Sequence, residues 1–247
     1  RIPTPSPPHQ ILVRGQAQHP IPKSVVMIHV GAVQEKSLKS VMENSEKYEL
    51  LKKIRDELIN LKESPLYEGR IKNKVFPVIG EGNHDAEIMF IGEAPGRNEA
   101  ATGRPFCGAA GQVLTELLES IGLNRKDVYI TNIVKDRPPD NRDPLPEEIK
   151  IYRPFLDRQI EIIKPKIIVT LGRYSMAYIL EKFGLENEPF VSAQGKLKSI
   201  SQIHGKVFDK DGVKIIPLYH PAVALYQNNL KKTLFKDFEI IKKALNS

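Results

Sequence analysis

The sequence predicts an α/β fold that is doubly wound, with a mostly parallel central sheet and helices on both faces. Short runs that are apolar throughout recur along the chain, and stretches with helical spacing separate them. Strands that are apolar on both sides belong to parallel sheets covered on both faces. Such sheets bind ligands beyond the carboxyl ends of their strands, so functional residues are expected just after each apolar run.

The 247 residues have room for one α/β domain with a buried core. We expect residues 1–44 to form a poorly ordered N-terminal extension, because this stretch is rich in proline and has no sustained period. Residues 45–247 are expected to form the folded domain. Its first helix begins at Ser45, a suitable N-cap, places Leu51, Ile54 and Leu58 on one face, and ends by Pro65.

The elements that follow alternate between strands and helices. We expect strands over residues 88–91, 128–130, 167–171 and 215–219, and helices over 112–121, 146–163, 173–183 and 229–245, with a turn at Asp211-Gly212. The four strands are followed in order by Gly92-Glu93-Ala94-Pro95-Gly96, Asn132, Gly172 and His220. These residues should therefore meet at one edge of the sheet.

Composition limits the classes of function. The net charge of +7 and pI near 9.3 suit a protein that binds a polyanion, although a solvated surface of mixed charges gives the same total. The single cysteine, Cys107, excludes a disulfide framework or a cysteine-built metal site within one chain, and we assign it no chemistry. No apolar run reaches the roughly 20 residues that span a bilayer, so we expect a soluble intracellular protein.

The segment from Gly92 to Gly111 reads GEAPGRNEAATGRPFCGAAG and is far longer than the ordinary connection of about 2 to 6 residues between a strand and a helix. It is either a surface turn or a functional loop, and its repeated glycines favour a backbone that approaches a ligand. Phe106 is either a core residue or, at the apex of this loop, a platform on which a base stacks.

Asn132 ends a strand, where it either caps the next turn or reads a ligand with its carboxamide. One carbonyl and one NH₂ group can accept from N3–H and donate to O4 of uracil, whereas cytosine presents the reversed pattern. The loop after it, residues 135–144, carries Lys135, Arg137 and Arg142. These side chains either pair with aspartates of the same loop or form a wall that contacts phosphates.

His220 is followed by Pro221 and four apolar residues, which make a short stiff loop. A lone histidine is commonly structural, but a stiff apolar loop can also wedge into a duplex from which a nucleotide has been removed.

Taken together, the motifs resemble those of the family 4 uracil-DNA glycosylases, the thermostable bacterial and archaeal type. They are GEAPG followed by Glu99, then GRPF with GAAG, TNIVK-x-RPP-x-NR, IKPKIIVTLG and HPA, in that order between about Glu81 and Leu245. The resemblance implies that Phe106 stacks on an extruded uracil, that Asn132 reads its edge, and that His220 donates a hydrogen bond to O2 of the departing base.

The resemblance also implies roles for the other motif positions. Glu93, Glu99 and Asn141 fall where the attacking water is positioned and the pocket shaped, and Glu99 with Asn141 resembles a coupled pair. The remaining expected contacts to the base come from Gly92, Ala94, Pro95 and Gly96. Those to DNA are expected from Arg137, Arg142, Pro221, Ala222, Val223, Ala224 and Leu225.

The chain departs from the family at the iron–sulfur site. Members generally carry four cysteines that bind a [4Fe-4S] cluster, and these positions fall near Leu61, Ser64, Asp136 and Tyr152. Leucine, serine and tyrosine cannot form that thiolate site, so we expect no cluster and no metal, with Tyr152 filling the space. Tyr226 also stands near the position of a basic residue that commonly follows the His-Pro motif.

The function implied is a monofunctional DNA repair glycosylase that removes uracil from single- or double-stranded DNA and leaves an abasic site. The resemblance further implies a monomer in the cytoplasm of a prokaryote, associated with the nucleoid. Two alternatives remain open: a DNA-binding or replication accessory protein with little turnover, and a glycosylase for another deaminated base such as hypoxanthine or xanthine.

Overall fold

The computed structural model describes residue 43 and residues 45–185 and 199–246. The extension expected over residues 1–44 lies almost entirely outside these described residues. The chain divides into two compact units, Arg1–Glu43 and Asn44–Ser247, and every strand and helix named below belongs to the second.

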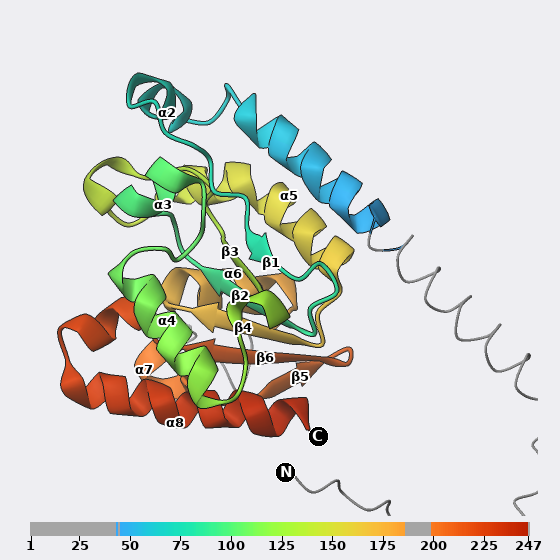
Figure 1. The fold of residues 1–247 in the computed structure, drawn as a ribbon, viewed down its shortest axis with the longest axis vertical. Helices are drawn as coiled ribbons and strands as arrows, with labels where there is room; N and C mark the ends of the chain where they lie inside the picture. Colours follow the sequence, from blue (N-terminus) through green and yellow to red (C-terminus); the bar gives the residue numbers. More distant parts are fainter. Residues whose placement is uncertain (1–42, 44, 186–198, 247) are drawn as a thin grey trace, which may run out of the picture. The chain divides into compact units, whose positions relative to one another are not determined.

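Six strands form one sheet in the order β1-β3-β2-β4-β6-β5. The four inner strands run parallel, and β1 and β5 pair antiparallel at the two edges (Figure 1). This confirms the expected mostly parallel sheet. The strands are β1 Glu81–Gly82, β2 Ile88–Gly92, β3 Tyr129–Asn132, β4 Ile167–Leu171, β5 Phe208–Lys210 and β6 Val213–Leu218.

Helices cover both faces of the sheet, as expected. They are the helix of residues 45–59, α2 Tyr67–Lys72, α3 Arg97–Thr102, α4 Ala109–Ser120, α5 Pro146–Ile163, α6 Arg173–Lys182, α7 Ile200–Ile203 and α8 Asn228–Leu245. Short 3₁₀ turns η1 Arg125–Asp127, η2 Pro139–Asn141 and η3 Pro221–Leu225 lie between them.

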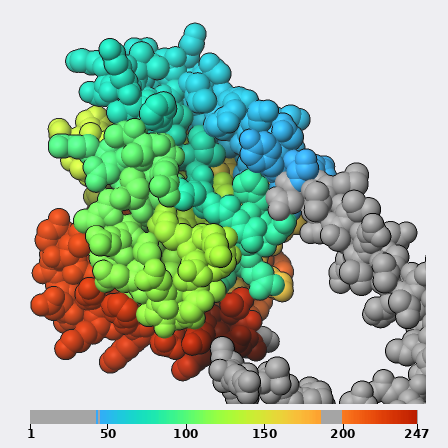
Figure 2. Space-filling model, viewed as in Figure 1, coloured from blue at the N-terminus to red at the C-terminus, as the bar shows by residue number. Residues whose placement is uncertain are grey.

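Alternate residues of the central strand β2 point into two separate apolar clusters. Met89 and Ile91 belong to the cluster beneath the helix of residues 45–59, α5 and α6, and Ile88 and Phe90 to the cluster beneath α4 and α8. The atoms of α4 and α8 lie against each other in the space-filling view (Figure 2). A strand buried on both faces has to be apolar throughout, which is why β2 and β4 could be predicted from the sequence.

The structure differs from the expected elements at short segments. α4 begins at Ala109 rather than Gln112, α3 lies inside the long loop after β2, and β5 precedes the turn at Asp211-Gly212. That turn joins β5 to β6 with both residues at positive φ. In the part of the chain that the structure describes, no helix combines the length and apolar character needed to cross a bilayer.

Candidate active site

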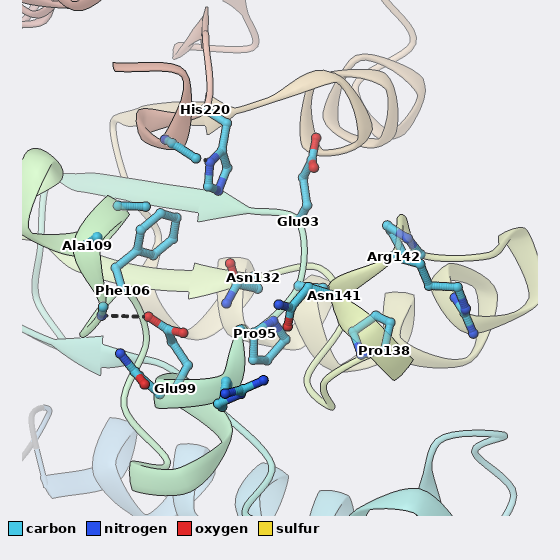
Figure 3. Close-up of a pocket in the computed structure, with 18 of the residues that line it drawn as sticks. Glu93, Pro95, Glu99, Phe106, Ala109, Asn132, Pro138, Asn141, Arg142 and His220 are labelled. Carbon is cyan, nitrogen blue, oxygen red and sulfur yellow. Dashed lines mark hydrogen bonds between the residues drawn. The ribbon is translucent and has the colours of Figure 1, made fainter. Parts of the chain in front are cut away.

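A cavity of about 530 Å³ opens at the carboxyl ends of the parallel strands, where the sequence predicted the functional residues. Its lining comes from the segments that follow β2, β3 and β6 (Figure 3). Of the predicted site residues it brings together Glu93, Ala94, Pro95, Gly96, Glu99, Phe106, Asn132, Asn141, Arg142, His220 and Ala222.

Asn132 is buried at the end of β3, paired in register with Gly92 of β2. Its side-chain Oδ1 is buried and has no hydrogen-bond partner among the described residues. A buried polar atom that stays without a partner costs about 1 to 3 kcal/mol. Oδ1 therefore remains available to accept a hydrogen bond at the cavity wall.

Phe106 lies 7 % exposed, with its backbone in the left-handed region at φ 48°. Two contacts hold this strained conformation. The Glu99 carboxylate accepts the backbone N–H groups of Cys107 and Gly108 at 2.9 and 2.8 Å, and a Cβ at Gly111 would fall 1.8 Å from the carbonyl oxygen of Phe106. Strain of this kind persists only where neighbouring contacts enforce it, and it is common at functional sites.

The His220 ring stacks on Phe106, with ring centroids 5.5 Å apart and planes 28° from parallel. Its Nδ1 accepts the backbone N–H of Ala222 at 3.2 Å. Nε2 therefore carries the hydrogen of the neutral ring and can donate into the cavity. Burial lowers the pKa of His220 to about 4, because the charged form would lose its hydration.

Glu93 and Glu99 both line the cavity but are held by different elements. One carboxylate oxygen of Glu93 accepts the backbone N–H of Tyr174 at 3.1 Å, at the N-terminus of α6. Burial raises the pKa of Glu93, and the bond to the Tyr174 N–H opposes this shift. Glu99 instead holds the loop that carries Phe106.

Asn141 also lines the cavity, at a positive φ of 54° within η2. Its Oδ1 accepts a hydrogen bond from Nε of Arg137 at 2.7 Å. Within the described residues Asn141 and Glu99 are hydrogen bonded to other partners and not to each other. The coupled pair expected from the resemblance stays a prediction.

The basic side chains of the loop after β3 do not form one wall. Arg142 lines the cavity and makes a bidentate ion pair with Glu148. Its Nη2 lies 2.6 Å from Oε1 and its Nη1 lies 2.9 Å from Oε2 of that residue. Arg137 is partly buried against Asn141. Lys135 is fully buried and cannot contact a phosphate, so its expected place in a phosphate-contacting wall is wrong. Neither arginine of this loop has a hydrogen bond to an aspartate carboxylate of the loop among the described residues.

The loop after His220 forms η3. Pro221 and Ala224 are buried, Ala222 and Val223 are half-buried, and Leu225 is 43 % exposed. Leu225 is therefore the most exposed member of this loop. Tyr226, at the mouth of the cavity, is 85 % exposed.

Three of the four positions near which the resembling family carries cluster cysteines, Ser64, Asp136 and Tyr152, meet in a buried polar network. The Ser64 hydroxyl lies 2.7 Å from the Tyr152 hydroxyl, which donates to the Asp136 carboxylate at 2.6 Å. Arg70 donates to both oxygens of Asp136 and to the carbonyls of Leu58 and Ile59. These oxygen groups satisfy one another and supply no thiolate, so the residues do not fit an iron–sulfur cluster.

Over residues 45–185 and 199–246, the structure holds no group of three or more His, Cys, Asp or Glu side chains arranged to bind a metal. The buried network includes Arg70, whose role has no local signal in the sequence because its partners lie 66 and 12 residues away.

The sequence matches a known protein family. Residues 79–243 match the uracil DNA glycosylase superfamily. The chain belongs to this superfamily. The matched residues include β2 to β6 and all the cavity residues named above, so the family expected from the motifs is confirmed.

Several of the similar curated proteins are named type-4 uracil-DNA glycosylases. A "Type-4 uracil-DNA glycosylase" of Sulfurisphaera tokodaii is 49 % identical over 197 residues, which cover 78 % of this chain and 83 % of that protein. One from Saccharolobus solfataricus is 48 % identical over 78 % of this chain and 86 % of its own length. One from Archaeoglobus fulgidus is 48 % identical, covering 69 % and 82 %.

Proposed function

We propose that this protein is a monofunctional uracil-DNA glycosylase, which hydrolyses the N-glycosidic bond of uracil in DNA and leaves an abasic site. The observation that carries the proposal is the unpartnered Oδ1 of Asn132, buried at the wall of a cavity whose other side chains suit a flat base. The names of the similar type-4 enzymes support the same reaction.

Recognition of uracil follows from the chemistry of Asn132. Its carbonyl accepts from N3–H of the base and its NH₂ group donates to O4, while the Phe106 ring contacts the face of the base. Cytosine would oppose donor to donor and acceptor to acceptor, and each mispaired buried group costs about 1 to 3 kcal/mol. The base has to leave the stack to reach this cavity.

Bond breaking leaves negative charge on the uracil ring and positive character on the sugar. Neutral His220 donates from Nε2 to O2, where the charge develops, and one such donor typically contributes about 3 to 4 kcal/mol to the transition state. Glu93, Glu99 and Asn141 surround the place of the attacking water. Glu99 and Glu93 each use carboxylate oxygens on backbone N–H groups, so only their remaining lone pairs are available to water.

A labelled oligonucleotide that contains a single uracil tests the proposal. After incubation and alkali treatment, cleavage is expected at the uracil and not at a cytosine in the same position. Asn132→Ala and His220→Ala should each lower the rate about 100-fold or more with the melting temperature retained. Binding of DNA without cleavage by the wild-type protein would instead indicate the accessory function. Cleavage at hypoxanthine or xanthine in preference to uracil would indicate the altered base preference.

We further propose that the protein works without an iron–sulfur cluster. The buried network around Asp136 and Tyr152 supports this proposal, because it occupies the family's cluster positions with mutually satisfied oxygens. Iron analysis of anaerobically purified protein tests it. Substoichiometric iron in a fully active preparation is expected, and one cluster's worth of iron per active molecule would contradict the proposal.

The proposal also covers the DNA substrate, the oligomeric state and the cellular location of the protein. We propose that it acts as a monomer on single- or double-stranded DNA, in the cytoplasm and on the nucleoid of a prokaryotic cell. The positive net charge suits contact with phosphates. Light scattering of the active protein, and rates on matched single- and double-stranded substrates, test the first two points directly.

A further inference from the structure

A lysine lies buried behind the residue that faces the base. Lys135 is fully buried, and its Nζ lies 2.6 Å from the backbone carbonyl oxygen of Asn132. Nζ also lies 2.7 Å from the Thr131 hydroxyl and 2.6 Å from Oε1 of Gln159. Lys135 therefore ties the end of β3 to α5, directly beneath the cavity.

The surroundings of Nζ match an ammonium group. Three short acceptors equal the three donors of a protonated lysine. The neighbouring donors are already used, since the Thr131 hydroxyl donates to the Ile79 carbonyl at 2.7 Å and Nε2 of Gln159 donates to the same oxygen at 2.9 Å. A neutral amine would present a lone pair that no donor faces. Burial lowers the pKa of Lys135 well below its usual value. Hydrogen bonds from the ammonium to three acceptors favour the charged form.

No carboxylate neutralises this group within the described residues. Lys135 has no ion pair there, and the adjacent Asp136 is turned away to Arg70 and Tyr152. A positive charge in a poorly polarisable interior acts over several ångströms, because water does not screen it. The group that gains negative charge in the proposed reaction is the uracil ring held by Asn132.

We propose that Lys135 is a positioning residue with an electrostatic role: its buried ammonium fixes the carbonyl of Asn132 and stabilises the uracil anion as the glycosidic bond breaks. The proposal rests on the proposed function. It assigns to the TNIVK segment a role beyond the contact of Asn132 with the base. The ammonium forms and breaks no bond and transfers no proton in the reaction.

Leaving-group dependence separates this role from a purely structural one. A fluorine at position 5 stabilises the departing anion by itself, so excision of 5-fluorouracil needs less help from the protein. Single-turnover rates on uracil and 5-fluorouracil in the same DNA are the measurement. Lys135→Met should slow uracil excision by at least about tenfold and slow 5-fluorouracil excision clearly less.

Two variants serve as controls for the hydrogen bonds and the charge. Thr131→Val removes one acceptor of Nζ but keeps the lysine, so both substrates should slow by the same factor. Lys135→Arg keeps the charge and should keep the wild-type ratio of the two rates, whatever its effect on either rate alone. An equal loss on both substrates in Lys135→Met, with the protein folded, would overturn the electrostatic role.

A measurement on the wild-type protein covers the case in which Lys135→Met does not fold. In lysine-labelled protein, a buried hydrogen-bonded ammonium gives a slowly exchanging NMR signal at neutral pH. Its presence is expected, and a neutral amine at that site would refute the proposal. Wild-type protein that leaves uracil in place would refute the proposed function instead, so the two failures are distinguishable.

Discussion

Gly92 shows how closely the residues around the cavity approach one another. A Cβ at this position would lie 2.3 Å from Oδ1 of Asn132 and 2.7 Å from Cζ of Phe106. Both neighbours line the cavity, so a side chain at Gly92 would displace them. The absence of a side chain at Gly92 is therefore a condition for the observed positions of Asn132 and Phe106.

Gly92→Ala is expected to lower uracil excision at least about tenfold, because the methyl group displaces the two side chains that hold the base. Gly69→Ala is the matched control, since nothing lies within 4 Å of a Cβ added at Gly69. Single-turnover rates and thermal melts of both variants provide the measurement. Wild-type excision by folded Gly92→Ala would show that the cavity is looser than the structure indicates.

The pH dependence of excision should reflect the low pKa of His220. Its folded-state pKa is about 4 and its ordinary value 6.5. The neutral donor form therefore persists as pH falls from 6.5 toward 4, and loss of activity through His220 is expected near pH 4. An acid limb centred near 6.5 would contradict this.

The same shift predicts a loss of stability in acid. Between pH 6.5 and 4 the unfolded chain binds a proton at His220 that the folded chain does not, so the free energy of unfolding falls as pH decreases. Denaturation midpoints for wild type and His220→Asn across this range isolate the contribution, which should be missing in the variant.

The place of a residue in the candidate site was predictable where its side chain has distinctive chemistry of its own. The amide of Asn132, the ring of Phe106 and the imidazole of His220 follow strands or occupy a loop apex in the sequence, and the structure brings them to one cavity. Lys135 was misplaced because a lysine is almost always exposed. Its burial depends on hydrogen-bond acceptors from Ile79 and Gln159. These residues are distant in the sequence, so no local pattern indicates the contact.

At the scale of elements, the turn between α3 and α4 depends on Glu99. The carboxylate accepts two backbone N–H groups just before α4, and these bonds hold Phe106 at its positive φ. In the proposed function, Glu99 acts through this loop as well as through any water it holds. Its amide and alanine variants separate the two roles.

Glu99→Gln keeps an oxygen that can accept the Cys107 and Gly108 N–H groups, whereas Glu99→Ala removes it. If the loop contact dominates, the glutamine variant should keep KM near the wild-type value and the alanine variant should raise it several-fold. Steady-state kinetics give the comparison. Equal kcat losses in both variants, with unchanged KM, would assign Glu99 to the water instead.

Elements were predicted best where burial imposes a simple pattern. β4 and α5 have the expected bounds, since one is a continuous apolar run and the other begins with a proline in its first turn. β1 and β5 were not predicted, because two- and three-residue edge strands bury too little to leave a period. The start of α4 was missed because Ala109 to Gly111 reads as a glycine-rich loop.

On the scale of the whole molecule, the buried network joins four parts of the chain. Arg70 of α2 contacts the end of the helix of residues 45–59 through the carbonyls of Leu58 and Ile59, and binds Asp136 in the loop after β3. Tyr152 connects α5 to the network, because its hydroxyl donates a hydrogen bond to Asp136. The network therefore fixes the N-terminal helices to the loop that carries Arg137 and Asn141.

Breaking this network should destabilise the whole domain. Asp136→Ala leaves the Arg70 charge buried and unpaired, which typically costs about 3 to 5 kcal/mol. Glu81→Gln is the control, because the Arg104–Glu81 pair is exposed and contributes about 0 to 1 kcal/mol. In the double variant Arg70→Met with Asp136→Leu, apolar packing replaces both charges and should recover much of the loss. Chemical denaturation of the four proteins, wild type included, measures these differences. If Asp136→Ala were no less stable than Glu81→Gln, the network would not hold the domain together, and the N-terminal helices would depend on their apolar contacts alone.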